Sequence, residues 1–82
     1  MFKATVNVTL KKSVLDPQGK TVLHALETLG FNEAKDLRVG KYFEITLNNA
    51  ERKQAETRLR AMCDQLLTNP VIEEYSYQLQ EA

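Results

Sequence analysis

The sequence predicts a small α+β domain built as a two-layer sandwich, with elements in the order β-α-β-α-β and two helices on one face of the sheet. Three observations support this prediction. Three segments alternate apolar and polar residues, as half-buried strands do. Two segments between them repeat apolar residues at helical spacing. The 82 residues suit one domain, which we expect to span residues 1–82 and to be oligomeric.

The first strand and the first helix have clear boundaries in the sequence. Every second residue is apolar over residues 2–11, which predicts a strand with one polar face. Asp16 and Pro17 then have the pattern of an N-cap followed by proline at the first helical position. The expected buried stripe of this helix consists of Val22, Ala25, Leu26 and Leu29. Gly30 is expected to end the helix in the left-handed conformation.

The middle strand is expected over residues 36–47, about twelve residues against a usual five or six. Gly40 lies inside it, where glycine typically marks a bulge or bend. A strand of this length would extend beyond its neighbours in a single sheet. We therefore expect the projecting part to pair with another copy of the chain.

The second helix is expected to begin at Ala50 with Asn49 as its N-cap, and to end at Asn69-Pro70. Its expected buried stripe consists of Ala55, Leu59, Met62 and Leu66. A third strand follows over residues 71–79, again with alternating character. Two helices with one apolar stripe each are sufficient to cover one face of a three-stranded sheet.

Composition excludes several classes of function. Eleven Lys and Arg balance eleven Asp and Glu, so the net charge offers no attraction to nucleic acid or to an anionic membrane, and we expect neither as a partner. One cysteine and one histidine cannot form a disulfide within the chain or a structural zinc site. The N-terminal residues alternate between polar and apolar, unlike a signal peptide, and the single cysteine is a free thiol. Both observations predict a cytoplasmic protein. Oligomerisation remains as the way for so short a chain to gain stability.

The residues that could carry chemistry have simpler structural interpretations. His24 lies on the outer face of the first helix without a visible partner, which is typical of a solvated residue. Cys63 flanks the second buried stripe and is interpreted as a small packed hydrophobe. Gly40-Lys41 lacks the remaining residues of a phosphate-binding loop. We therefore predict no catalytic residue, no cofactor-binding residue and no metal ligand in this chain.

Lys41 and the strand tyrosines each allow two interpretations from the sequence. Lys41 falls on the apolar side of its strand, so either a bulge at Gly40 turns it outward or it meets an acidic group at an interface. The tyrosines on the strands are either packed at the edge of the core or placed for an interface; they are Tyr42, Tyr75 and Tyr77.

Several segments together resemble a known family. Asp16–Gly19 entering the first helix, Gly30 ending it, Leu37–Lys41 in the middle strand, and Met62–Tyr75 near the C-terminus are similar to PurS, the small subunit of phosphoribosylformylglycinamidine synthase. The resemblance covers the whole chain, in order. Its most specific parts are the Arg-Val-Gly-Lys sequence and the Leu-Leu-x-Asn-Pro-Val-Ile-Glu sequence.

This resemblance implies a function in de novo purine biosynthesis. In the multi-subunit synthase, a glutaminase subunit releases ammonia, and a large synthetase subunit uses it with ATP and magnesium. The resemblance implies that the small subunit has no activity and no cofactor of its own, assembles with itself as a dimer or tetramer, bridges the other two subunits and supports ammonia transfer. The contact residues expected on this basis are Arg38, Gly40, Lys41, Asn69, Pro70 and Tyr75.

A different class of protein remains as the alternative. Small regulatory domains that bind an amino acid or a nucleotide at an oligomer interface share the alternating order of strands and helices. They usually hold the ligand at a glycine-rich turn between a strand and a helix. Here the corresponding turn, residues 13–19, has a single glycine.

Overall fold

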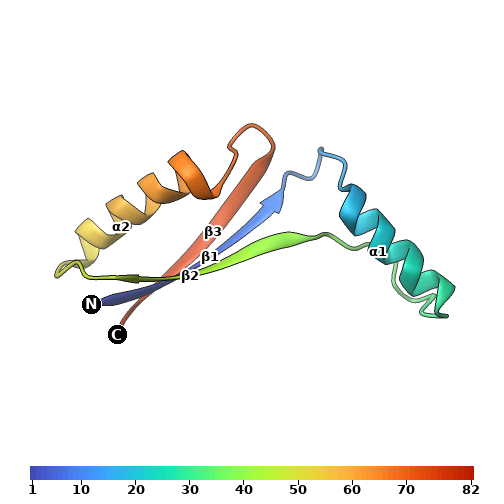
Figure 1. Ribbon diagram of the computed structural model, residues 1–82, viewed down its shortest axis with the longest axis horizontal. Coiled ribbons are helices and arrows are strands. Elements are labelled where there is room, and N and C mark those ends of the chain that lie inside the picture. The colour runs from blue at the N-terminus through green and yellow to red at the C-terminus, as the bar shows by residue number, and fades with distance from the viewer.

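The computed structural model describes residues 1–82 and confirms the predicted α+β class. The elements are β1 (Phe2–Leu10), α1 (Pro17–Thr28), β2 (Gly40–Leu47), α2 (Arg52–Met62), a π-helical turn η1 (Cys63–Leu67) and β3 (Glu73–Glu81). Figure 1 shows the three strands as one twisted sheet, with α2 along one face and α1 at the far end of the molecule.

The first strand is the centre of the sheet. The strand order is β2-β1-β3, and β1 runs antiparallel to both neighbours. Val8 therefore faces Lys41 on one side and Tyr75 on the other. The side chains of Phe2, Ala4, Val6 and Val8 point to the face that we call the inner face, which α2 covers.

The middle strand in sequence is shorter than predicted. It contains eight residues, against nine in each neighbour, so the predicted strand over 36–47 is wrong in its first third. The physical reason is that the N–H of Val39 donates to the carboxylate of Asp16 at 2.8 Å, which diverts this segment toward α1. The third strand begins at Glu73, two residues later than predicted, because the N–H groups of Val71 and Ile72 donate to Asn69 in a turn.

Helix α2 packs on the inner face through Ala55, Leu59 and Cys63, all fully buried. The predicted stripe is correct for its first residues and wrong at Leu66, which is 82% exposed. The cause is the turn η1, closed by a hydrogen bond from Thr68 N–H to the Cys63 carbonyl at 2.9 Å. This wider turn changes the helical phase, so that Leu67 packs against the core instead.

The N-terminus of α2 also differs from the prediction. The helix begins at Arg52, and its N-cap is Glu51, whose carbonyl accepts from Ala55 N–H at 3.0 Å. The predicted cap at Asn49 with a start at Ala50 is therefore two residues too early. The Glu51 side chain makes no capping hydrogen bond.

Helix α1 does not cover the sheet, and the prediction of two helices on one face is wrong for a single chain. The helix projects from the body beside its own linker to β2 (Figure 1), and Leu23 of the helix and Leu37 of the linker border the same cavity. We call residues 17–39 the arm. Three apolar residues of the predicted stripe are exposed, and we call them the arm stripe; they are Val22, Ala25 and Leu29.

The arm makes the molecule unusually long. The chain measures 50 × 27 × 14 Å, with a radius of gyration of 16.3 Å, whereas a compact chain of this length has about 12 Å. The end of α1 is nevertheless well formed. Gly30 has φ of +97°, as predicted, and Phe31 N–H donates to the Leu26 carbonyl at 2.9 Å, which is the bond expected of a Schellman cap.

Candidate interaction surface

A single carboxylate joins the arm to the body. Asp16 accepts from Gly19 N–H at 2.9 Å as the N-cap of α1, and from the N–H of Val39, the residue before β2, at 2.8 Å. These two bonds, that to Val39 first, hold the pKa of Asp16 below its ordinary value of 3.8. A Cβ on Gly19 would lie 2.6 Å from the Leu37 carbonyl oxygen, so this position requires glycine. The sequence predicted the cap but not the second bond.

The guanidinium of Arg38 closes the same junction from the other side. It donates to the carbonyl oxygens of Lys11 at 2.9 Å, Val14 at 3.2 Å and Leu10 at 3.4 Å. These carbonyls belong to the end of β1 and the loop that follows. We call the group formed by Asp16, Gly19, Arg38 and Val39 the arm root.

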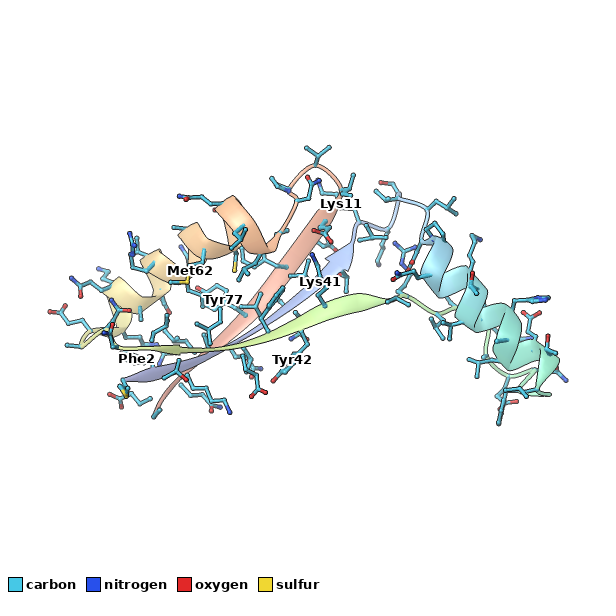
Figure 2. The ribbon with its side chains drawn as sticks, viewed as in Figure 1. Phe2, Lys11, Lys41, Tyr42, Met62 and Tyr77 are labelled. Atoms are coloured by element: carbon cyan, nitrogen blue, oxygen red, sulfur yellow. The ribbon has the colours of Figure 1, made fainter.

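Lys41 lies on the inner face, beside an acidic residue of the same chain. Its Nζ is 3.5 Å from Glu73 and 3.5 Å from the Leu67 carbonyl oxygen. The pairing of Thr9 with Gly40 and of Val8 with Lys41 is continuous, so the bulge interpretation is wrong. Figure 2 shows Lys41 and Tyr77 on the α2 side of the sheet and Tyr42 on the opposite side. A signal for this pair was present in the sequence, because Glu73 also falls on the apolar side of its strand.

The turn before β3 is held by Asn69. Its carbonyl accepts from Glu73 N–H at 2.7 Å, and its side-chain oxygen accepts from Val71 N–H at 3.1 Å. In return, Glu73 accepts from Asn69 N–H at 2.8 Å. The turn exposes Pro70, and it positions the carboxylate that pairs with Lys41.

Of the three strand tyrosines, Tyr75 and Tyr77 pack against the core and Tyr42 lies on the surface. Tyr75 is half-buried against the core, and burial raises the pKa of its phenol, with Asp64 adding to the effect. The hydroxyl of Tyr77 accepts from Arg60 Nε at 3.2 Å. Tyr42, in contrast, is 59% exposed on the outer face, where no helix covers the sheet.

The structure thus gathers five of the six predicted contact residues near one end of the sheet. Gly40, Lys41 and Tyr75 face the last residues of β1, and Asn69 and Pro70 form the adjacent turn. Arg38 instead belongs to the arm root. Between α1 and this end of the sheet lies a cavity of about 470 Å³, lined by residues that include Pro17, Gln18, Lys41 and Glu73.

The side chains that most often carry chemistry are not assembled into a site. His24 is exposed on the arm. Cys63 is fully buried, and burial raises the pKa of its thiol, which disfavours the reactive thiolate. No three His, Cys, Asp or Glu side chains are grouped to hold a metal ion. None of the helices has the length and the hydropathy of a membrane span.

The turn between β1 and α1 does not offer the cradle that a regulatory ligand-binding domain uses. Asp16 itself occupies the N-terminus of α1 and is 4% exposed. A carboxylate at this position repels an anionic ligand and uses the backbone donor of Gly19. The expected alternative function therefore has little support at this turn.

Comparison with known proteins gives consistent matches over the whole chain. The family model PurS, described as phosphoribosylformylglycinamidine (FGAM) synthase, matches residues 3–81. A Bacillus subtilis protein named phosphoribosylformylglycinamidine synthase subunit PurS is 47% identical over 81 residues, which cover 99% of this chain and 95% of that protein. A protein of the same name from Methanocaldococcus jannaschii is 38% identical over 81 residues, covering 99% and 98%.

Solved structures match the fold equally well. The structure of Bacillus subtilis PurS has a TM-score of 0.91 at 47% identity, covering 99% of this chain and 100% of that one. A chain in the structure of PurLQS from Thermotoga maritima has a TM-score of 0.88 at 31% identity, covering 95% of each chain. The projecting arm is therefore compatible with experimentally solved relatives.

Proposed function

This chain belongs to the PurS family, and from that membership we propose that it is the non-catalytic small subunit of a phosphoribosylformylglycinamidine synthase in purine biosynthesis. In this proposal it acts in the cytoplasm, and it bridges the glutaminase and synthetase subunits. Relatives named as subunits of this synthase, and the relative found in PurLQS, support this assignment.

The state of the potentially reactive side chains supports a role without chemistry. A general base or a nucleophile needs a partner that adjusts its pKa and orientation. His24 points into solvent from the arm, and Cys63 is closed inside the core. In this proposal the synthetase subunit uses ATP and magnesium, and this chain contributes contact surfaces that hold the other subunits in place.

Surface area is the observation that carries the assembly role. The chain exposes 6154 Å², whereas a folded monomer of 9.4 kDa exposes about 5,000 Å². The excess of about 1,100 Å² matches what one copy buries in an obligate dimer, about 1,000 Å² or more. A chain with only 12 of 82 residues buried needs such an interface for stability.

The arm indicates how two copies associate. Val22 of the arm stripe borders a surface that also includes Pro17, Gln18 and Val39. These last three residues also line the cavity beside the inner face, so the two surfaces are continuous. We propose that two copies exchange arms, so that α1 of one copy completes the helical layer over the sheet of the other. This arrangement supplies in two chains the second helix that the sequence predicted on that face.

In this proposal, the complex of the three subunits supports the transfer of ammonia from the glutaminase site to the synthetase site. Ammonia that escapes into water is protonated or lost, so the glutaminase and synthetase sites must be held in a sealed arrangement. A rigid dimer at their junction fixes this arrangement without touching the reaction. The end of the sheet that carries Lys41, Glu73 and Asn69 is the proposed contact surface.

Reconstitution tests the proposal. The chain is mixed with purified glutaminase and synthetase subunits, and product formation is measured with glutamine or with ammonium as the nitrogen donor. We expect the chain to be required for the glutamine-dependent reaction and for co-elution of the three subunits on gel filtration. If the other two subunits form a fully active glutamine-dependent complex without this chain, the proposal fails.

A further inference from the structure

A second cavity lies on the other side of the arm root. It has a volume of about 410 Å³ and is formed by the β1–α1 loop, the first turns of α1 and the linker that enters β2. Four of the eleven basic residues of the chain line it. They are Lys12, Lys20, Lys35 and Arg38. In a chain with no net charge, this is a local concentration of positive charge.

Asp16 and Asp36 also line this cavity and reduce its positive charge, but neither forms an ion pair with a lysine. Asp16 accepts from two backbone N–H groups, and Asp36 accepts from Leu37 N–H at 2.9 Å. The ion pairs of the chain lie elsewhere and involve Lys3, Lys41 and Arg52. The three lysines of the cavity therefore carry charges without an ion-pair partner.

Apart from Ser13, the remaining lining is aliphatic, and hydrogen bonds hold the segments that form it. Leu15 is 65% exposed at this cavity, with Leu23 and Leu37 half-buried beside it. The hydrogen bonds of Asp16 and Arg38 fix the three segments that carry the lysines. A site held in place before binding loses less conformational entropy when the partner arrives.

We propose that this cavity, which we call the basic cavity, docks an acidic segment of another subunit of the synthase. Carboxylates of that segment pair with Lys12, Lys20 and Lys35, and an apolar side chain covers Leu15. A free phosphate or nucleotide fits less well, because Arg38, the side chain best suited to bidentate phosphate binding, already donates to three carbonyl oxygens. The inference rests on the proposed function, since it assumes that the chain assembles with other subunits.

The basic cavity stays open when two copies exchange arms. At about 100° per residue, Lys20 lies on the side of α1 opposite to Leu29. Lys20 and Leu23 line the basic cavity, whereas Val22 of the arm stripe borders a separate surface that it shares with Pro17, Gln18 and Val39. One side of the arm is therefore available for a second copy and the other side for a different protein.

A charge-reversal experiment tests this assignment. The double variant Lys12→Glu/Lys35→Glu changes two loop residues of the basic cavity. The control Lys53→Glu/Arg58→Glu makes the same change in net charge on the exposed side of α2. Binding of each variant to the glutaminase subunit and to the synthetase subunit is measured by calorimetry at several salt concentrations, and self-association by sedimentation.

We expect the cavity variant to lose at least tenfold in affinity for one of the two subunits, with a smaller salt dependence, while its self-association stays unchanged. The control variant should bind as the unmodified chain does. Equal affinity of the cavity variant and the unmodified chain would overturn the inference, as would an equal loss in both variants or a loss of self-association. The inference would also be overturned if the unmodified chain bound inorganic phosphate or ATP in this cavity and the charge reversal left binding to the subunits unchanged.

The two proposals fail in different ways. If the unmodified chain binds neither subunit, the proposed function is wrong. If the unmodified chain assembles and the charge-reversed chain assembles equally well, only the assignment of the basic cavity is wrong.

Discussion

Removing the apolar side chains of the arm stripe should separate the copies without unfolding the chain. The variant Val22→Gln/Leu29→Gln replaces side chains that are 43% and 73% exposed by a residue of high helix propensity. Full burial of a valine or leucine stabilises by about 1.5–3 kcal/mol. Scaled by the exposed fractions, the lower value gives about 1.7 kcal/mol per copy. Two symmetric copies then lose about 3.5 kcal/mol, which raises the dimer Kd about 300-fold.

Sedimentation across a wide concentration range measures this change. A matched control, Leu66→Gln/Val71→Gln, also removes one leucine and one valine, at positions 82% and 77% exposed on the body. The control should leave the Kd within a few-fold, and circular dichroism should show both variants folded. If the arm variant and the unmodified chain have the same Kd, or if both variants lose association equally, the arm exchange is refuted.

Three further predictions concern single residues. Lys41→Ala should lower the glutamine-dependent activity of the reconstituted complex while ammonia-dependent activity is largely kept; equal loss with both donors would indicate a general defect. Gly19→Ala should lower the melting temperature, although alanine favours a helix by about 1 kcal/mol, because its Cβ would lie 2.6 Å from the Leu37 carbonyl oxygen; a higher melting temperature contradicts this. Because the pKa of Asp16 is lowered in the folded chain, its contribution to stability is complete above pH 3.8 and is lost as the pH falls through the folded-state pKa. Asp16→Asn should therefore make the free energy of unfolding fall less steeply with decreasing pH on the acid side. An unchanged slope would contradict the assignment.

The sequence predicted the features that depend on neighbouring residues. The class, the element order, the N-cap at Asp16, the proline at the first helical position and the left-handed Gly30 are all confirmed. Each follows from local backbone chemistry or from periodicity, which a single chain displays in full. The start of β1 and the first buried residues of α2 are correct for the same reason.

The errors arise where a distant group decides the structure. Residues 36–39 have the pattern of a strand, but Asp16 captures the N–H of Val39. Leu66 has the spacing of a buried residue, but a π-helical turn shifts the phase after Met62. The apolar stripe of α1 was assigned to the sheet of its own chain, and no pattern in one sequence distinguishes that surface from the surface of a second copy.

The candidate surface was predicted in part. The position of Lys41 on the apolar side of its strand indicated either a bulge or contact with an acidic group, and the family resemblance suggested Asn69, Pro70 and Tyr75 as further contact residues. The basic cavity was not predicted, because its lysines come from three separate segments and approach one another only after the arm root has formed. Clusters of this kind have no signature in residue spacing.

In the arm root, the groups that set the direction of the arm differ from the side chains that would contact a binding partner. Asp16 and Arg38 hold the arm through main-chain N–H groups and carbonyl oxygens, which every residue except proline provides. Exposed positions on both sides of α1 are thus free to mutate without turning the helix to a new angle. A lineage, or an engineer, could exchange the binding partners of this small protein one at a time while its architecture stays constant.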